Sequence, residues 1–420
     1  MSKPSPGQPA LLRELNDRAA LTLLLEAGPL TRNELATRTG LSKPTAAEII
    51  RRLEGVELIR PAGTKPAPRG PSALAYEAIV DTSLAVAIDV QLVDVRACVV
   101  DARGGHHPVD EYRLSDAEMQ GDSIVLIRAA IDRATALAGV RADDVIAVCI
   151  GLQASVDHAA DTLSFTDTLL GWPRQQVAGT LSAALGLQVI LENDANLAAI
   201  AERNAGAGRC TSSFALMWMA EGLGMALDID GRVHSGATGA AGEVGYLGAP
   251  IEALALDPDA EIVADLILES AVADLAHAHG ITGPDGTALD WRGVLAVLGG
   301  LDPKHPFFAA LGQRVAYNAL PALAVADPEV LILHGPTGVA GGPALAAAAT
   351  AWLRTKTRWA TPFVAPGVTA TPVLFGARHV LIDAVRAALA RRLSGVDGSG
   401  ASAAPGDTTS RPASLERAPQ

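Results

Sequence analysis

The chain has 420 residues, 49% of them hydrophobic, so it is long enough for two or three domains with sizeable cores and too apolar for a disordered polypeptide. No apolar run approaches the roughly 20 residues that cross a bilayer, and charged residues interrupt the N-terminal apolar stretch, so the sequence argues against a membrane span or secretory signal and predicts a cytoplasmic protein. The net charge of −13 alone argues against nucleic acid, but residues 1–75 hold eleven Lys or Arg and seven Asp or Glu, so a mildly basic head precedes an acidic body.

The head begins with a helical pattern over residues 16–27, which Gly28-Pro29 ends. Thr31 and Glu34 form a Thr-x-x-Glu capping box, which predicts a second short helix to about Thr39. Gly40 then provides a tight turn, and Ser42 is a natural N-cap for a third helix. Pro44 fits the first turn of that helix, where its missing N–H leaves no hydrogen bond unmade.

The third helix has an apolar face for the core and a polar remainder that could reach DNA. Its buried residues are expected to be Ala46, Ile49, Ile50 and Leu53. Short polar and basic side chains near the start of such a helix suit base edges in the major groove, and later Arg side chains suit phosphates. The expected DNA contacts on this helix are Ser42, Lys43, Thr45, Glu48, Arg51 and Arg52.

A basic arm follows the third helix. Residues 58–60 and 74–76 are expected to form two strands, joined by a Pro-rich segment that carries Lys65 and Arg69. Such a segment stays extended and can lie along a narrow minor groove, where the potential is most negative. The three helices and this wing together predict a winged helix-turn-helix that binds double-stranded DNA. The alternative is a protein-interaction module whose charges form a solvated face.

The body alternates strand-like apolar runs with helical patterns, which predicts α/β layers from about residue 82. Strands are expected over residues 84–89, 96–100, 144–152, 189–192, 214–219, 225–229, 330–334 and 368–373. Helices are expected over residues 123–137 and from Ala195, Phe307, Ala344 and Ala377. From residue 394 onward Gly, Ser, Ala, Pro and Thr dominate, so a disordered tail is expected there.

Two motifs in the body resemble the ROK family, which contains bacterial sugar kinases and sugar-responsive repressors. They are Glu192-Asn193-Asp194-Ala195-Asn196 and Gly239-Ala240-Ala241-Gly242-Glu243-Val244-Gly245-Tyr246. The resemblance implies a two-lobed actin-like ATPase fold of the ribonuclease H-like type. The resulting domains are a winged helix-turn-helix over 1–78, a ROK-like effector and oligomerisation domain over 79–393, and the tail over 394–420.

The resemblance also implies an effector site. In ROK proteins the Asn-Asp pair, a Glu and a His hold the sugar hydroxyls, and carried over to this chain these are Asn193, Asp194, Glu243 and Tyr246, the last in place of the His. Asp194 could instead serve only to cap the helix that opens at Ala195. The family's zinc motif is missing, because Tyr246 replaces the His ligand and no Cys follows it. No metal and no cofactor are therefore expected.

The nucleotide-binding elements of the kinases are degraded here. Gly-rich loops hold phosphates through backbone amides, but the first loop reads Asp89-Val90-Gln91-Leu92-Val93 without its glycines. The second loop, Ala220-Glu221-Gly222-Leu223-Gly224, would place a carboxylate near polyphosphate. The third, His334-Gly335-Pro336-Thr337-Gly338, matches only in part. Asp194 stands where the family has its catalytic base, but we predict a protein that is not an enzyme.

The sequence thus predicts a DNA-binding regulator that responds to a sugar or sugar-phosphate effector and acts as a homodimer or higher homo-oligomer. The family resemblance favours a repressor. Two alternatives remain: an ATP-dependent sugar kinase with an accessory DNA-binding head, and a DNA-binding regulator that needs no ligand.

Overall fold

The computed structural model describes residues 9–66, 71–166 and 169–394. The chain divides into two units, one made of residues 1–79 and 387–420 and the other of residues 80–386. The division falls inside the last helix, α12 (Pro372–Ser394). Apart from Ser394, the predicted tail lies outside the described residues. Within the described ranges, no helix combines the length and the apolar character that a bilayer crossing requires.

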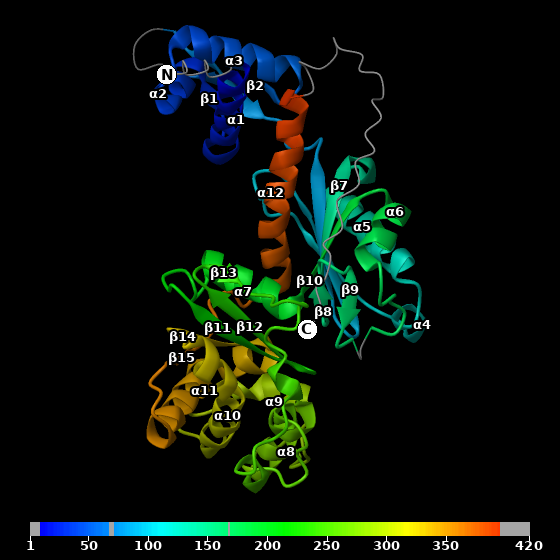
Figure 1. Cartoon of the computed structure of the whole chain (residues 1–420), viewed down its shortest axis with the longest axis vertical. Helices are drawn as coiled ribbons and strands as arrows, with labels where there is room; N and C mark the ends of the chain where they lie inside the picture. Colours follow the sequence, from blue (N-terminus) through cyan, green and yellow to red (C-terminus); the bar gives the residue numbers. More distant parts are fainter. Residues whose placement is uncertain (1–8, 67–70, 167–168, 395–420) are drawn as a thin grey trace, which may run out of the picture. The chain divides into compact units, whose positions relative to one another are not determined.

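The first unit holds three helices and a small antiparallel sheet in the order β1-β3-β2 (Figure 1). Its elements are α1 (Pro9–Ala27), β1 (Leu30–Thr31), α2 (Arg32–Thr39), α3 (Lys43–Gly55), β2 (Ile59–Lys65) and β3 (Ala73–Ala78). This confirms the predicted helix order and the two wing strands. The short strand β1 was not predicted, and it joins the turn before α2 to the wing through pairs with β3.

The predicted caps define the second and third helices. Thr31 caps α2, because its side chain accepts the Glu34 N–H and the Glu34 carboxylate accepts the Thr31 N–H. Gly40 ends α2 at φ 71°, in the left-handed region that favours glycine. Ser42 then caps α3. The predicted apolar face of α3 is buried, with Ala46, Ile49, Ile50 and Leu53 at most 2% exposed.

The second unit contains two lobes, each built on a five-stranded sheet (Figure 1). The first lobe has the strand order β10-β7-β4-β5-β6, in which β4 pairs in parallel with β7 and β7 with β10. Its elements are β4 (Leu84–Val90), β5 (Asp94–Val100), β6 (Val109–Arg113), α4 (Asp116–Met119), α5 (Ser123–Ala138), β7 (Val145–Leu152), β8 (Ser155–Asp157), β9 (Thr162–Ser164), α6 (Val177–Leu185) and β10 (Gln188–Asn193). Because parallel strands end at the same edge of a sheet, β7 and β10 deliver their following loops to one place.

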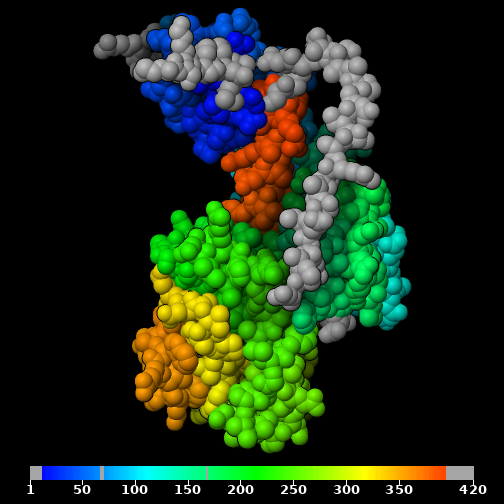
Figure 2. All heavy atoms as spheres, viewed as in Figure 1, coloured from blue at the N-terminus to red at the C-terminus, as the bar shows by residue number. Residues whose placement is uncertain are grey.

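The second lobe has the strand order β13-β12-β11-β14-β15. Its elements are β11 (Phe214–Met219), β12 (Leu223–Ile229), β13 (Arg232–Val233), α8 (Glu269–Ala278), α9 (Trp291–Leu298), α10 (Pro306–Ala326), β14 (Val330–His334), α11 (Gly335–Lys356) and β15 (Phe363–Val364). Helices α8 to α11 and this sheet share one apolar core. In Figure 2 the atoms of this lobe, coloured from light green to orange, form one continuous mass.

Helix α7 (Asp194–Ala205) connects the two lobes and is buried along most of its length. It starts where β10 ends, packs on β11 and β12, and contacts α12. The contact with α12 is so close that a Cβ added to Gly376 would lie 1.9 Å from the Leu197 carbonyl oxygen. Only glycine permits this approach of the two backbones.

The predicted strand over 368–373 is wrong. The sheet ends instead with β15, and α12 begins at Pro372. The N–H groups of Gly367 and Val368 donate to the buried carboxylate of Glu202 on α7, at 2.8–3.1 Å, rather than to a neighbouring strand. The helix predicted from Ala344 is confirmed as the second part of α11: the non-helical backbone of Gly342 separates it from a first helical part that begins at Gly335 and was not predicted.

The close contact of α7 and α12 gives a stability prediction. Replacement of Gly376 by Ala should lower the free energy of unfolding of the second unit by about 1–3 kcal/mol, because the methyl group forces two packed helices apart. Gly299→Ala is the matched control, since nothing lies within 4 Å of a Cβ at that exposed position. Differential scanning calorimetry should show a lower transition temperature for Gly376→Ala alone; equal transitions would contradict this account of the packing.

Candidate functional site

The exposed face of α3 carries most of the residues predicted to contact DNA. Ser42, Lys43, Glu48 and Arg51 are exposed, and Thr45 is half-buried. The hydroxyls of Ser42 and Thr45 lie 2.8 Å apart, and Glu48 pairs with Arg51 at 3.2 Å. The first turn of α3 therefore presents hydroxyl and ammonium groups, while the Arg51 side chain is 75% exposed further along the helix.

Arg52 has a role inside the head that the sequence analysis did not anticipate. Its guanidinium donates two hydrogen bonds to the Asp17 carboxylate of α1, at 2.9 and 2.5 Å. The Asp17 side chain is only 9% exposed, so this bidentate pair neutralises a carboxylate at the junction of α1 and α3. The geometry favours a structural role for Arg52, whereas Arg51 faces solvent.

Of the two wing residues predicted to contact DNA, the structure describes Lys65. Lys65, at the end of β2, donates to the Pro29 carbonyl oxygen and lies 3.7 Å from the Glu34 carboxylate. It therefore holds the wing to the turn between α1 and α2. Arg69 lies outside the described residues.

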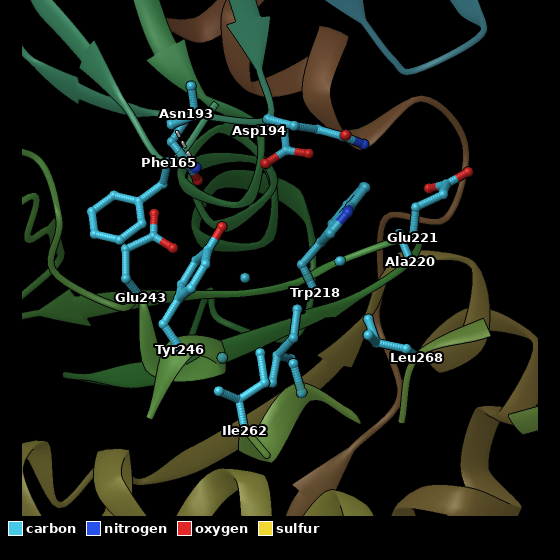
Figure 3. A pocket seen from close by; sticks show the side chains of 17 residues that line it. Phe165, Asn193, Asp194, Trp218, Ala220, Glu221, Glu243, Tyr246, Ile262 and Leu268 are labelled. Carbon is cyan, nitrogen blue, oxygen red and sulfur yellow. Dashed lines mark hydrogen bonds between the residues drawn. The ribbon is translucent and has the colours of Figure 1, made fainter. Parts of the chain in front are cut away.

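The residues of the predicted effector site come together in the second unit, around a cavity of 320 Å³ (Figure 3). Asn193 and Asp194 come from the junction of β10 and α7, and Glu243 and Tyr246 from the loop after β13. The turn between β11 and β12 closes a further side with Glu221. A cavity of this size is at the small end of the roughly 300–1,000 Å³ of organic ligand sites.

Asn193 is the N-cap of α7, so the capping role considered for Asp194 belongs to its neighbour. The Asn193 side chain accepts the Asn196 N–H at 3.1 Å and donates to the Ala154 carbonyl at 3.1 Å. Asp194 is the first residue of α7 and is 5% exposed, and it accepts the Ala195 N–H at 2.8 Å. Both side chains line the cavity, where Asn193 is already fixed by hydrogen bonds within the protein.

Asp194 holds its proton near neutral pH. Burial, together with the negative charges of Asp89 and Glu243, raises the pKa of Asp194 to about 8. As a neutral carboxylic acid it can donate one hydrogen bond and accept others, which matches the needs of a sugar hydroxyl. Burial also raises the pKa of Glu243 and, to about 6, that of Asp89.

Glu243 is positioned by its own loop and by the first lobe. The buried hydroxyl of Ser155 donates to its carboxylate. Gly239 and Gly242 have φ angles of 81° and 96°, and a Cβ at either position would collide with the backbone of Val156 or Met225. These two glycines of the motif thus let the loop approach β8 and β12 closely enough to place Glu243 in the cavity.

Tyr246, which stands in for the family's His, is 48% exposed at the cavity. Its ring lies 4.9 Å from the ring of Phe165, a residue with the unusual φ angle of 52°. In the described part of the chain, no cluster of three or more His, Cys, Asp or Glu could hold a metal ion. The phenol and the segment after it do not fit the zinc that the family resemblance implies.

The three segments that the sequence resemblance aligns with phosphate-binding loops carry side chains that contact one another or line the cavity. The Gln91 amide donates to the Asp89 carboxylate and accepts from Gln153, which follows β7, at 3.2 Å, so the side chain at the centre of the first loop is already engaged within the protein. Glu221 in the second loop lines the cavity, with the Arg292 guanidinium 3.7 Å away. His334 at the third motif stacks on Trp218, with ring centroids 5.2 Å apart. These residues do not fit a bound nucleoside triphosphate.

Several cavity residues were missed by the sequence analysis. They are Phe165, Trp218, Ile262 and Leu268. Trp218 could have been found, because it lies just before the predicted loop at 220–224 and therefore at the end of a strand facing the cleft. Ile262 and Leu268 come from an irregular segment with no periodic pattern, which gave no signal.

Comparison with known proteins agrees with both parts of this description. Residues 85–261 match the ROK family, and residues 13–60 match the winged helix-turn-helix DNA-binding family. A glucokinase of Streptomyces coelicolor is 28% identical over 168 residues, which are 39% of this chain and 49% of that protein. A xylose repressor of Caldicellulosiruptor bescii is 22% identical over 243 residues, 57% of this chain and 60% of that protein. The chain spans about half the length of these curated relatives.

A solved structure extends the likeness to nearly the whole chain. It is a ROK family transcriptional regulator described as a homologue of the E. coli Mlc protein, with 16% identity and a TM-score of 0.66. The match covers 92% of this chain and 100% of the other. The fold predicted from the sequence, a winged helix-turn-helix followed by a two-lobed actin-like ROK domain, is therefore confirmed.

The raised pKa of Asp194 predicts a pH dependence of stability. Because the folded-state pKa of about 8 lies above the ordinary 3.8, protonation favours the folded state. The wild type should therefore lose several kcal/mol of stability relative to Asp194→Asn as pH rises from about 4 to 8. Urea unfolding of the second unit at several pH values measures this difference, with the exposed Asp259→Asn as the control. A difference in stability that does not change with pH would show that burial does not raise the pKa of Asp194.

Proposed function

We propose that this chain, which belongs to the ROK family and carries a winged helix-turn-helix before its ROK domain, is a transcriptional regulator that binds operator DNA and releases it when a sugar occupies the cleft. Two observations together support this proposal. Helix α3 has an exposed polar face, and the cleft keeps residues that can bind hydroxyl groups while its phosphate loops lack their glycines. A repressor fits best, since a repressor is among the relatives of similar sequence. Its place of action is then the cytoplasm.

The head supports DNA binding through the separation of two faces on α3. The apolar face is buried against α1 and the sheet, while Lys43 and Arg51 face outward with Ser42 and Thr45. A helix of this kind contacts base edges near its N-terminus and phosphates further along. Because such heads read two half-sites about one helical turn apart, we propose that the protein binds a nearly palindromic operator as a homodimer or higher homo-oligomer.

The cleft supports binding without phosphoryl transfer. Asn193, Asp194 and Glu243 offer donors and acceptors for hydroxyl groups, and Tyr246 adds an aromatic face. The side chains of Gln91 and Glu221 stand in the two phosphate loops, where a kinase needs glycine and backbone N–H groups. We therefore propose that the ROK domain of this chain senses a ligand and is not an enzyme.

A route from the cleft to the head runs along the chain itself. Asp194 begins α7, α7 packs against α12 at Leu197 and Gly376, and α12 continues into the unit that contains the head. A ligand that prefers one arrangement of α7 can shift the population of head arrangements only by its difference in affinity for the two. Release of DNA therefore requires that the sugar bind the DNA-free form more tightly.

Arg51 and Arg52 provide a matched test of DNA binding. Arg51→Gln should weaken binding to the DNA upstream of the protein's own gene and reduce the slope of log K against log salt by roughly 1, with unchanged stability. Arg52→Gln should instead lower the stability of the head by about 1–3 kcal/mol, because it leaves the Asp17 carboxylate without its partner.

Fluorescence anisotropy at several salt concentrations measures the first effect and thermal unfolding the second. Lys356→Ala, an exposed change on α11, is the control for nonspecific loss of charge. Salt-independent binding, or no binding at all, would contradict the proposed function.

Glu243 tests the response to sugar. Glu243→Ala should keep the affinity for operator DNA. The sugar concentration that releases half of the DNA should rise about tenfold or more, because the sugar loses its hydrogen bond to the Glu243 carboxylate. The measurement is anisotropy of labelled operator DNA titrated with uncharged hexoses and pentoses. Addition of MgATP should produce no sugar phosphate, and turnover that Asp194→Asn abolishes would identify a kinase instead.

A further inference from the structure

The cavity has a polar part and an apolar part, and the second part exceeds what a simple sugar needs. Asn193, Asp194 and Glu243 form the polar part. The apolar part consists of Trp218, Leu223, Ile262, Ala264 and Leu268. In the view of Figure 3, Trp218 stands between Asp194 and Tyr246 on one side and Leu268 and Glu221 on the other.

Trp218 lines this cavity and carries a hydrogen-bond donor without a partner among the described residues. Its side chain is 8% exposed, and its Nε1–H is buried with no hydrogen-bond partner among the described residues. Buried indole N–H groups usually have a partner, because leaving one unpaired costs the full free energy of its desolvation. A bound molecule with an acceptor oxygen at this point would satisfy it.

The indole is held in place from behind. The ring of His334 stacks on it at an interplanar angle of 19°. His334 is itself fixed, because its Nδ1 accepts the Gly335 N–H at 2.8 Å and its Nε2 lies 3.0 Å from the Val368 carbonyl oxygen. A donor fixed in this way binds an acceptor without the entropic cost of ordering a mobile side chain.

The lining of the cavity selects against anions. Asp194, Glu221 and Glu243 line it, and none of its described lining residues is Lys or Arg. The guanidinium of Arg292 reaches Glu221 from outside the lining, at 3.7 Å, and its side chain is 58% exposed. A phosphate or carboxylate group in the cavity would therefore meet carboxyl groups with no cation directed at it.

From these observations we infer that the effector is an uncharged glycoside with an aromatic or similarly apolar aglycone. Its sugar hydroxyls meet Asn193, Asp194 and Glu243, its aglycone lies among Leu223, Ile262 and Leu268, and its glycosidic oxygen accepts the Trp218 Nε1–H. Sugar phosphates are excluded. This inference rests on the proposed function and specifies the chemical class of its ligand.

The test compares matched ligands by isothermal titration calorimetry on the full chain. The probes are methyl, phenyl and phenyl 1-thio glycosides of glucose and xylose in both anomers, together with glucose 6-phosphate. For at least one sugar, the phenyl glycoside should bind more tightly than the methyl glycoside by a factor of about ten or more, because the phenyl ring leaves water for an apolar surface. Glucose 6-phosphate should not bind.

Trp218→Phe tests the hydrogen bond. It keeps an aromatic ring but removes the N–H, so it should weaken the phenyl O-glycoside about three- to tenfold. The phenyl thioglycoside should be nearly unaffected, because sulfur is a weak acceptor. Trp352→Phe, in the same lobe but outside the cavity, is the matched control.

Three results would overturn the inference: no preference for phenyl over methyl, binding of glucose 6-phosphate, or an equal effect of Trp218→Phe on the oxygen and sulfur glycosides. The comparison of ligands on the wild type needs no variant and stands even if Trp218→Phe fails to fold. If a free sugar releases operator DNA while phenyl glycosides do not bind, this inference fails and the proposed function stands. If no sugar or glycoside binds, both fail.

Discussion

The cleft is governed by one electrostatic constraint, the crowding of carboxyl groups around the buried Asp194. Burial is the largest cause of the raised pKa of Asp194, and the negative charges of Asp89 and Glu243 raise it further, so that Asp194 stays protonated near neutral pH. A site with this charge distribution disfavours polyphosphate and favours neutral hydroxyl-rich molecules. The altered phosphate loops have the same consequence, because Gln91 and Glu221 put side chains where a nucleotide would need backbone N–H groups.

In the head, the ion pair between Arg52 and Asp17 gives one of two neighbouring arginines a structural role. Arg51 and Arg52 are adjacent in the sequence, but they lie on different faces of α3, where Arg52 is bound to Asp17 and Arg51 is exposed. The pair holds α1 against α3 and thereby fixes the orientation of the helix that faces DNA. Positive charge on α3 therefore stabilises the head at Arg52 and faces solvent at Arg51. The sequence alone predicted that both residues contact DNA.

Local signals predicted much of the fold, and long-range contacts account for what they missed. The capping box at Thr31, the N-cap at Ser42 and the apolar periodicity of α3 depend on neighbours within a few residues, and the structure has each of them. The strand expected over 368–373 is absent because the N–H groups of Gly367 and Val368 bind Glu202, which is remote in the sequence. The two motifs predicted that Asn193, Asp194, Glu243 and Tyr246 lie at one site, and these residues line one cavity. Nothing in the sequence indicated that Trp218, which also lines it, would carry an unpaired donor.

We propose that the cleft holds a neutral sugar or glycoside and has lost nucleotide binding. The most direct test is a crystal structure of the full chain grown with MgATP and a sugar or phenyl glycoside that releases the protein from DNA. We expect density for the sugar between Asp194 and Glu243 and none for ATP between the lobes. Ordered ATP with its terminal phosphate in line with a sugar hydroxyl would contradict it.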